Sequence, residues 1–88
     1  MRNIIITGAS GGLAQEMVKF LPHDRLILVG RSKDKLEELY GGRENLDLVE
    51  LDITDNLALE RFADWIDSQY GHVDVLVNNA GYGIFEEF

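Results

Sequence analysis

Short apolar runs alternate along this chain with segments whose apolar residues recur every three or four positions. The runs are rich in Ile, Leu and Val, as expected of strands that are buried on both faces. They predict strands at 3–7, 25–29, 46–51 and 73–77. The segments between them predict three helices, which begin near residue 13, after Ser32 and within 54–56. Because strands and helices alternate through short links, we expect parallel strands joined by right-handed crossovers.

The helical segments also predict which side chains face the sheet. In the first helix, expected over 13–21, Leu13, Met17 and either Phe20 or Leu21 share one face. In the third helix the matching apolar positions are Leu59, Phe62, Ala63, Ile66 and Tyr70. Helices on both faces of a parallel sheet make an α/β fold of the Rossmann type, with about four strands in the order 3-2-1-4. We expect a single domain over residues 1–88.

Composition narrows the range of partners. The chain has 88 residues, a net charge of −8 and no cysteine. The negative charge disfavours nucleic acids and anionic membranes as partners. No apolar run approaches the roughly 20 residues that span a bilayer. Without cysteine there is no disulfide or thiolate chemistry, which suits a cytoplasmic protein.

A glycine-rich turn, TGASGGLA, follows the first predicted strand. Gly8 permits a tight turn out of the strand, and Gly12, with Gly11 beside it, lets a pyrophosphate approach the backbone. The N–H groups that begin the next helix favour phosphate, and Ser10 adds a hydroxyl donor. The series Gly8, Gly12 and Ala14 fits one dinucleotide-binding pattern. The series Gly8, Gly11 and Ala14 fits another. An ordinary glycine-rich turn is the alternative interpretation.

Three further strand ends carry a family resemblance. The second predicted strand ends in GRS (30–32), the third in LDITD (51–55) and the fourth in NNAG (78–81). With TGASGGLA, these segments make the sequence similar to the short-chain dehydrogenase/reductase family over nearly the whole chain. The NNAG segment favours the spacing through Gly12, and Ala14 stands where the family usually has a third glycine. The resemblance implies the N-terminal, nucleotide-binding part of a larger fold that transfers hydride between a nicotinamide and a carbonyl or alcohol.

The resemblance implies a role for each matching position. The positions that would line the pyrophosphate and the nicotinamide-side ribose are Gly8, Ser10, Gly12 and Leu13. Asp52 would accept a hydrogen bond from the adenine amino group, with Ile53 beside the ring, unless Asp52 is only a turn or helix-capping residue. The positions that would pack against the adenosine ribose and the sheet are Asn79, Ala80 and Gly81. The alternative for the asparagines is that they only tie strand four to its neighbours.

The end of the second predicted strand bears on the choice of cofactor. An acidic residue there would bind a free ribose 2′-hydroxyl and repel a 2′-phosphate. Here the position holds Gly30, followed by Arg31, whose guanidinium fits a phosphate with two parallel hydrogen bonds. Ser32 and Lys35 could add contacts. The sequence therefore favours NADP over NAD, with a solvated loop cation as the alternative for Arg31.

The resemblance also implies catalytic residues that this sequence does not supply. The family uses a Ser and a Tyr, with a Lys four residues after the Tyr. The residues four positions after the three tyrosines (40, 70 and 82) are Glu44, Asp74 and Glu86. We therefore expect the chain to bind a dinucleotide but to be inactive alone, as a truncated part of a longer protein. The alternative is a non-catalytic nucleotide-sensing or self-assembling module.

Self-association is a further expectation. A fourth strand without a fifth beside it leaves an exposed edge, and exposed edges favour pairing with another chain. The tail at 82–88 is also apolar enough to dock on a neighbour. We expect a homo-oligomer that forms through the strand-four edge or the C-terminal tail.

Overall fold

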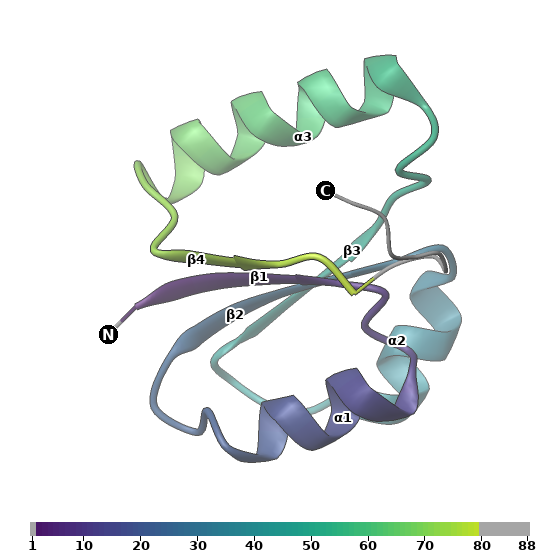
Figure 1. Ribbon diagram of the computed structural model, residues 1–88, viewed down its shortest axis with the longest axis vertical. Coiled ribbons are helices and arrows are strands. Elements are labelled where there is room, and N and C mark those ends of the chain that lie inside the picture. Colours follow the sequence, from purple (N-terminus) through teal and green to yellow (C-terminus); the bar gives the residue numbers. More distant parts are fainter. Residues whose placement is uncertain (1, 80–88) are drawn as a thin grey trace.

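The computed structural model describes residues 2–79, which form a four-stranded parallel sheet between two layers of helices (Figure 1). The strand order is β3-β2-β1-β4, so the predicted order is confirmed. The strands are β1 (Asn3–Thr7), β2 (Arg25–Gly30), β3 (Leu46–Glu50) and β4 (Val75–Val77). Since all the pairings are parallel, the carboxyl ends of the strands lie at one edge of the sheet.

The three helices are α1 (Gly12–Lys19), α2 (Lys33–Tyr40) and α3 (Asn56–Gln69). Ser32 caps α2, because its hydroxyl accepts a hydrogen bond from the backbone N–H of Lys35. Asp55 caps α3 in the same way through the N–H of Ala58. After α3, Gly71 adopts a φ of 80°, a left-handed conformation that suits glycine at a helix end. Within residues 2–79, none of the helices has the length and apolar content that crossing a bilayer requires.

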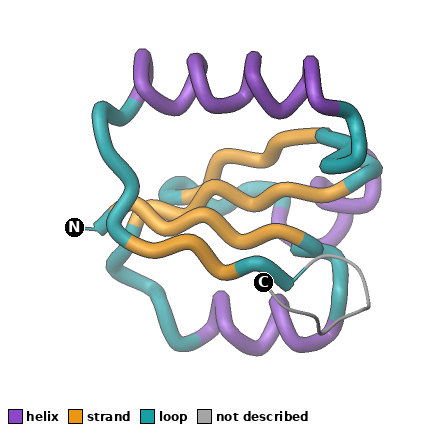
Figure 2. The backbone as a smooth tube through the Cα atoms, turned by 45° about the horizontal axis from the view of Figure 1, so that its top comes forward, coloured by secondary structure: helices purple, strands orange, loops and turns teal. Residues whose placement is uncertain are grey.

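Alternate residues of the sheet build two separate cores. Helices α1 and α2 cover one face, where Ile4, Ile6 and Leu28 are buried, and α3 covers the other face, where Ile5 and Ile27 are buried. Figure 2 shows the same three layers from another side. Strands covered on both faces read as continuous apolar runs, which is why β1 and β2 were predictable to within one residue.

The face of α1 that meets the sheet differs from the predicted one. Leu13 and Phe20 are 64% and 79% exposed, whereas Ala14 and Val18 are buried. Met17 and Leu21 pack at the margin of this core, so the predicted face is confirmed at Met17 and, for its last position, at Leu21, and it is wrong at Leu13. The small side chain of Ala14 lies against the sheet, and this close approach turns the larger Leu13 outward.

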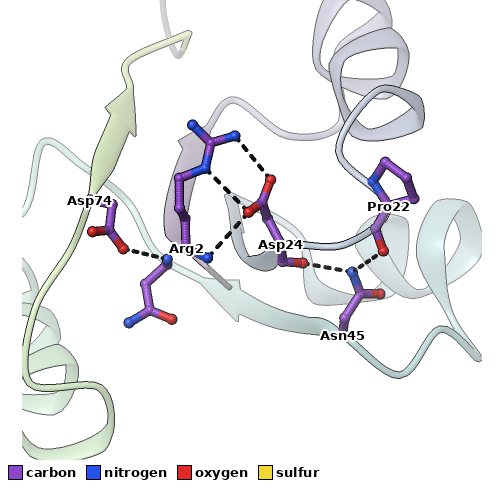
Figure 3. A network of polar contacts seen from close by, with 6 residues as sticks. Arg2, Pro22, Asp24, Asn45 and Asp74 are labelled. Carbon is purple, nitrogen blue, oxygen red and sulfur yellow. Dashed lines mark hydrogen bonds and ion pairs between the residues drawn. The ribbon is translucent and has the colours of Figure 1, made fainter.

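Polar contacts hold the opposite, amino-terminal edge of the sheet (Figure 3). The Asp24 carboxylate accepts three hydrogen bonds from Arg2, one from its backbone N–H and two from its guanidinium. Asn45 donates to the carbonyl of Asp24 at 2.7 Å, and the Asp74 carboxylate accepts from the N–H of Asn3 at 2.8 Å. β4 begins at Val75, two residues later than predicted, directly after this contact. These contacts fix where β1, β2 and β4 begin.

Candidate functional site

The turn after β1 lies at the carboxyl-terminal edge of the sheet. Gly8 has a φ of 62°, which is the left-handed conformation expected of a glycine at this point. The Gly8 carbonyl accepts a hydrogen bond from the N–H of Gly11 at 3.1 Å, and the N–H of Ala9 donates to the Val29 carbonyl of β2 at 3.0 Å. The turn is therefore closed on itself and tied to the neighbouring strand.

The start of α1 is open, unlike the starts of α2 and α3. Gly11 is its N-cap residue and has no side chain to accept a hydrogen bond from the helix, and the first turn has no acidic residue. The first hydrogen bond of the helix runs from the N–H of Gln15 to the Gly11 carbonyl. The N–H groups of Gly12, Leu13 and Ala14 therefore precede the helical hydrogen-bond ladder. Unpaired N–H groups at a helix start, with the helix dipole behind them, are the arrangement that binds phosphate.

The free space beside the turn distinguishes between the two glycine patterns that fit the sequence. Apart from its chain neighbours and the backbone of α1, a Cβ built on Gly12 would meet no atom of residues 2–79 within 4 Å, so the space above it is open. A Cβ on Gly11 would lie 3.4 Å from the Gly8 carbonyl oxygen, in ordinary contact with the turn itself. Gly12 therefore provides a bare backbone surface that a β-carbon would fill. The sequence-predicted residues Gly8, Ser10, Gly11, Gly12 and Leu13 lie in this turn and at the start of α1, where the bare backbone leaves room for a phosphate group.

Arg31 and Asp52 lie together at the ends of β2 and β3. The Arg31 guanidinium is 3.8 Å from the Asp52 carboxylate, and the two side chains are 81% and 48% exposed. Hydrogen bonds from the Thr54 hydroxyl and the Thr54 N–H, together with the charge of Arg31, hold the pKa of Asp52 below its usual value. Thr54 occupies one oxygen of the Asp52 carboxylate, Oδ1, in a local turn. An exposed ion pair at this distance is weak, so Arg31 can exchange it for a phosphate.

Sequence reasoning missed a carboxylate beside this pair. Glu50, the last residue of β3, pairs in register with Gly30 and accepts a hydrogen bond from the Lys33 N–H at 2.8 Å. Together with Ser32, it occupies the start of α2. The sequence shows that an acidic residue ends the third strand. Only the register of β3 against β2 shows that Glu50 lies at the start of α2.

Thr7 joins the ends of β1 and β4. Its hydroxyl oxygen accepts a hydrogen bond from the Asn79 N–H at 2.9 Å and lies 3.0 Å from the Asn78 side-chain oxygen, to which it donates. These contacts tie β4 to β1 through the Asn79 backbone and the Asn78 side chain. Sequence reasoning had not singled out Thr7. The predicted site residues Ala80 and Gly81 lie outside the described residues.

Ile53 and two surface grooves lie on the α3 side. Ile53 packs at the margin of the core beneath α3. A largely apolar groove of about 500 Å³ is lined by Ile5, Leu76 and residues of α3. A second, of about 460 Å³, lies between β3 and the start of α3. Neither groove is lined by residues 8–13, so the surface at the start of α1 is separate from both.

Two of the three tyrosines fall within the described residues. Tyr40 is buried and its hydroxyl donates a hydrogen bond to the Ala9 carbonyl. Tyr70 stacks edge-on against Trp65 and lies under the Arg25 guanidinium. Both therefore have packing partners of their own, and Tyr82 lies outside the described residues.

Comparison with known proteins identifies the family. The family model for short chain dehydrogenase matches residues 2–88. The chain is 36% identical over 94 residues to an 11-beta-hydroxysteroid dehydrogenase of Pinus massoniana, covering 96% of this chain and 26% of the relative.

Solved structures agree with the sequence match. The fold resembles the 3-ketoacyl-(acyl-carrier-protein) reductase of Brucella melitensis complexed with NADH, with a TM-score of 0.78, 30% identity, and coverage of 93% of this chain and 35% of that one. It also resembles a variant of ElxO with NADPH bound, with a TM-score of 0.76, 32% identity, and coverage of 96% and 37%. The chain thus spans between 26% and 37% of the length of these proteins. Sequence match, strand order and glycine turn agree, and the chain belongs to the short-chain dehydrogenase family.

Proposed function

We propose that this chain is the NADP(H)-binding part of a short-chain dehydrogenase/reductase that interconverts a carbonyl and an alcohol. The observation that carries the proposal is the uncapped start of α1 beside the Gly8 turn, with Arg31 at the end of the next strand. A bound nicotinamide dinucleotide supplies or accepts the hydride. The described residues bind and orient that dinucleotide.

Each part of the site has a separate task in this proposal. The N–H groups at the start of α1 and the bare backbone at Gly12 hold the pyrophosphate. The outer oxygen of the Asp52 carboxylate, which Thr54 does not occupy, accepts from the adenine amino group. Ile53 lies beside the adenine ring, and Asn79 beside the ribose. Ser10 adds a hydroxyl donor to the phosphates.

The preference for NADP over NAD rests on the end of β2. Gly30 presents no carboxylate that would repel a 2′-phosphate, and a Cβ there would lie 3.2 Å from the Leu36 side chain. Arg31 is highly exposed and only weakly paired with Asp52. Solved relatives hold NADPH in one case and NADH in another, so they favour neither cofactor, and the preference rests on Gly30 and Arg31 of this chain.

Calorimetric titration of the 88-residue chain with NADP and with NAD tests the proposal. A charge-assisted hydrogen bond to the 2′-phosphate is worth roughly 1.5–3 kcal/mol, which corresponds to a preference for NADP of about tenfold or more. Arg31→Ala is expected to remove this preference and leave NAD binding unchanged. The matched control is Arg25→Ala, which deletes the same charge at the opposite end of β2. Equal affinities of the unaltered chain for NADP and NAD would refute the preference.

We also propose that the chain self-associates through β4. Within residues 2–79, this strand pairs only with β1, and its central residue Leu76 is 62% exposed. An unpaired strand edge with an exposed apolar side chain is a template for a second copy. The C-terminal tail, the second predicted contact, lies outside the described residues.

A further inference from the structure

The last residue of α2 reaches the glycine turn. Tyr40 is 4% exposed, and its hydroxyl donates a hydrogen bond of 2.5 Å to the carbonyl of Ala9, which is itself fully buried. The two residues are 31 positions apart and belong to the same core cluster as Ala14 and Leu36. Burial raises the pKa of the Tyr40 hydroxyl, so it stays protonated and remains a donor at neutral pH.

Ala9 is held on both sides of its backbone. Its N–H donates to the Val29 carbonyl at 3.0 Å, and its carbonyl accepts from Tyr40. A trans peptide unit is planar, so the carbonyl of one residue and the N–H of the next point in opposite directions. Residues 2–79 contain no cis peptide bond. The inward Ala9 carbonyl therefore directs the N–H of Ser10 outward.

The Ser10 N–H is free to bind a ligand. Ser10 is exposed, and none of the hydrogen bonds within residues 2–79 uses its N–H. It lies in the turn that precedes the open start of α1. A reversed Ala9–Ser10 peptide would instead present a carbonyl oxygen, which repels phosphate, at the same place.

We infer that Tyr40 is a positioning residue, which fixes the Ala9–Ser10 peptide so that the Ser10 N–H faces the cofactor pyrophosphate. The inference rests on the proposed function, because it assigns one more donor to the same site. A buried hydroxyl needs a hydrogen-bond partner, and the partner of Tyr40 is the carbonyl of the peptide unit whose N–H belongs to Ser10. Here it selects one of two peptide orientations.

Titration of Tyr40→Phe with NADP and with NAD tests the inference. Both dinucleotides carry the pyrophosphate, so we expect both affinities to fall by the same factor, about tenfold for one lost hydrogen bond to a charged group. The ratio between the two affinities stays unchanged, in contrast to Arg31→Ala. The matched control is Tyr70→Phe, whose hydroxyl makes no hydrogen bond within residues 2–79 and whose loss should leave both affinities unchanged.

The amide resonances of the turn give a second measurement that does not depend on the affinities. In Tyr40→Phe the peptide is expected to exchange between two orientations, which broadens the Ser10 and Gly11 signals; in Tyr70→Phe they stay sharp. In the unaltered chain, the Ser10 amide proton is expected to shift when inorganic pyrophosphate or NADP is added, and this holds even if Tyr40→Phe does not fold.

The outcomes separate the two proposals. If the unaltered chain binds neither dinucleotide, the proposed function and this inference both fail. If the chain binds but its Ser10 amide does not shift, or if Tyr40→Phe binds both dinucleotides as tightly as the unaltered chain, only the inference is overturned.

Discussion

Gly12→Ala adds one methyl group at the first position of α1. Apart from its chain neighbours and the backbone of α1, the new carbon would meet no atom of residues 2–79 within 4 Å. Alanine favours a helix over glycine by roughly 0.5–1 kcal/mol in a helix interior, and we take this as the upper limit for a first-turn position. For a domain of this size, 1 kcal/mol changes the melting temperature by about 4–8 °C. The fold is therefore expected to be as stable as before or slightly more stable.

The same methyl group occupies the surface that we assign to the pyrophosphate. Displacing a phosphate from one charge-assisted hydrogen bond weakens binding by roughly 1.5–3 kcal/mol, or about 10- to 100-fold in dissociation constant. Gly12→Ala should therefore separate the two properties, with unchanged or raised stability and a large loss of affinity for NADP and NAD alike.

Thermal unfolding by circular dichroism and calorimetric titration measure the two properties independently. Gly71→Ala is the opposite control, because its backbone has a φ of 80° and any L-residue is strained there. This variant should lose stability, by roughly 1–3 kcal/mol, while its folded fraction keeps the original affinity. If Gly12→Ala binds dinucleotide as tightly as the unaltered chain, the phosphates do not lie on Gly12 and the assignment of the site is refuted.

Three further predictions concern the frame around the site. Hydrogen bonds from Arg2 hold the pKa of Asp24 below its usual 3.8. The Asp24 carboxylate therefore stabilises the fold above about pH 4, and this contribution is lost as the pH falls through the folded pKa. In acid titrations followed by circular dichroism, Asp24→Asn should lose less stability than the unaltered chain. Asp55→Ala removes the cap of α3 and should lower the free energy of unfolding by about 1 kcal/mol in urea denaturation. Leu76→Lys charges the exposed edge of β4 and should lower the oligomer fraction in light scattering, whereas a monomeric unaltered chain would refute the proposed self-association.

Much of the fold was predictable because its signals are local. Asn3–Thr7 is a buried β-branched run, and both of its ends were predicted to the residue. Ser32 carries a short oxygen side chain directly before a helical segment and marked the start of α2, whereas the start of α3 was narrowed to residues 54–56, of which Asp55 is the cap. The face of α1 was not predictable, because its apolar residues fit two helical phases. Only the contact between Ala14 and the sheet selects one of them.

The geometry of the candidate site was predictable at positions where the backbone requires glycine. It was not predictable where residues from two distant elements make contact. The conformation of Gly8 and the open surface at Gly12 follow from glycine itself. The contacts of Tyr40 with Ala9 and of Glu50 with Lys33 join residues from different elements. Their positions depend on strand register and helix packing, which local patterns do not specify.

Mapping amide shifts during titration with NADP tests most directly where the phosphates bind. We expect the largest shifts at residues 8–13 and at Arg31, with the amides of α3 unchanged. Shifts confined to α3 and the strands beneath it would place the ligand in one of the grooves there, and they would contradict a phosphate site at the start of α1.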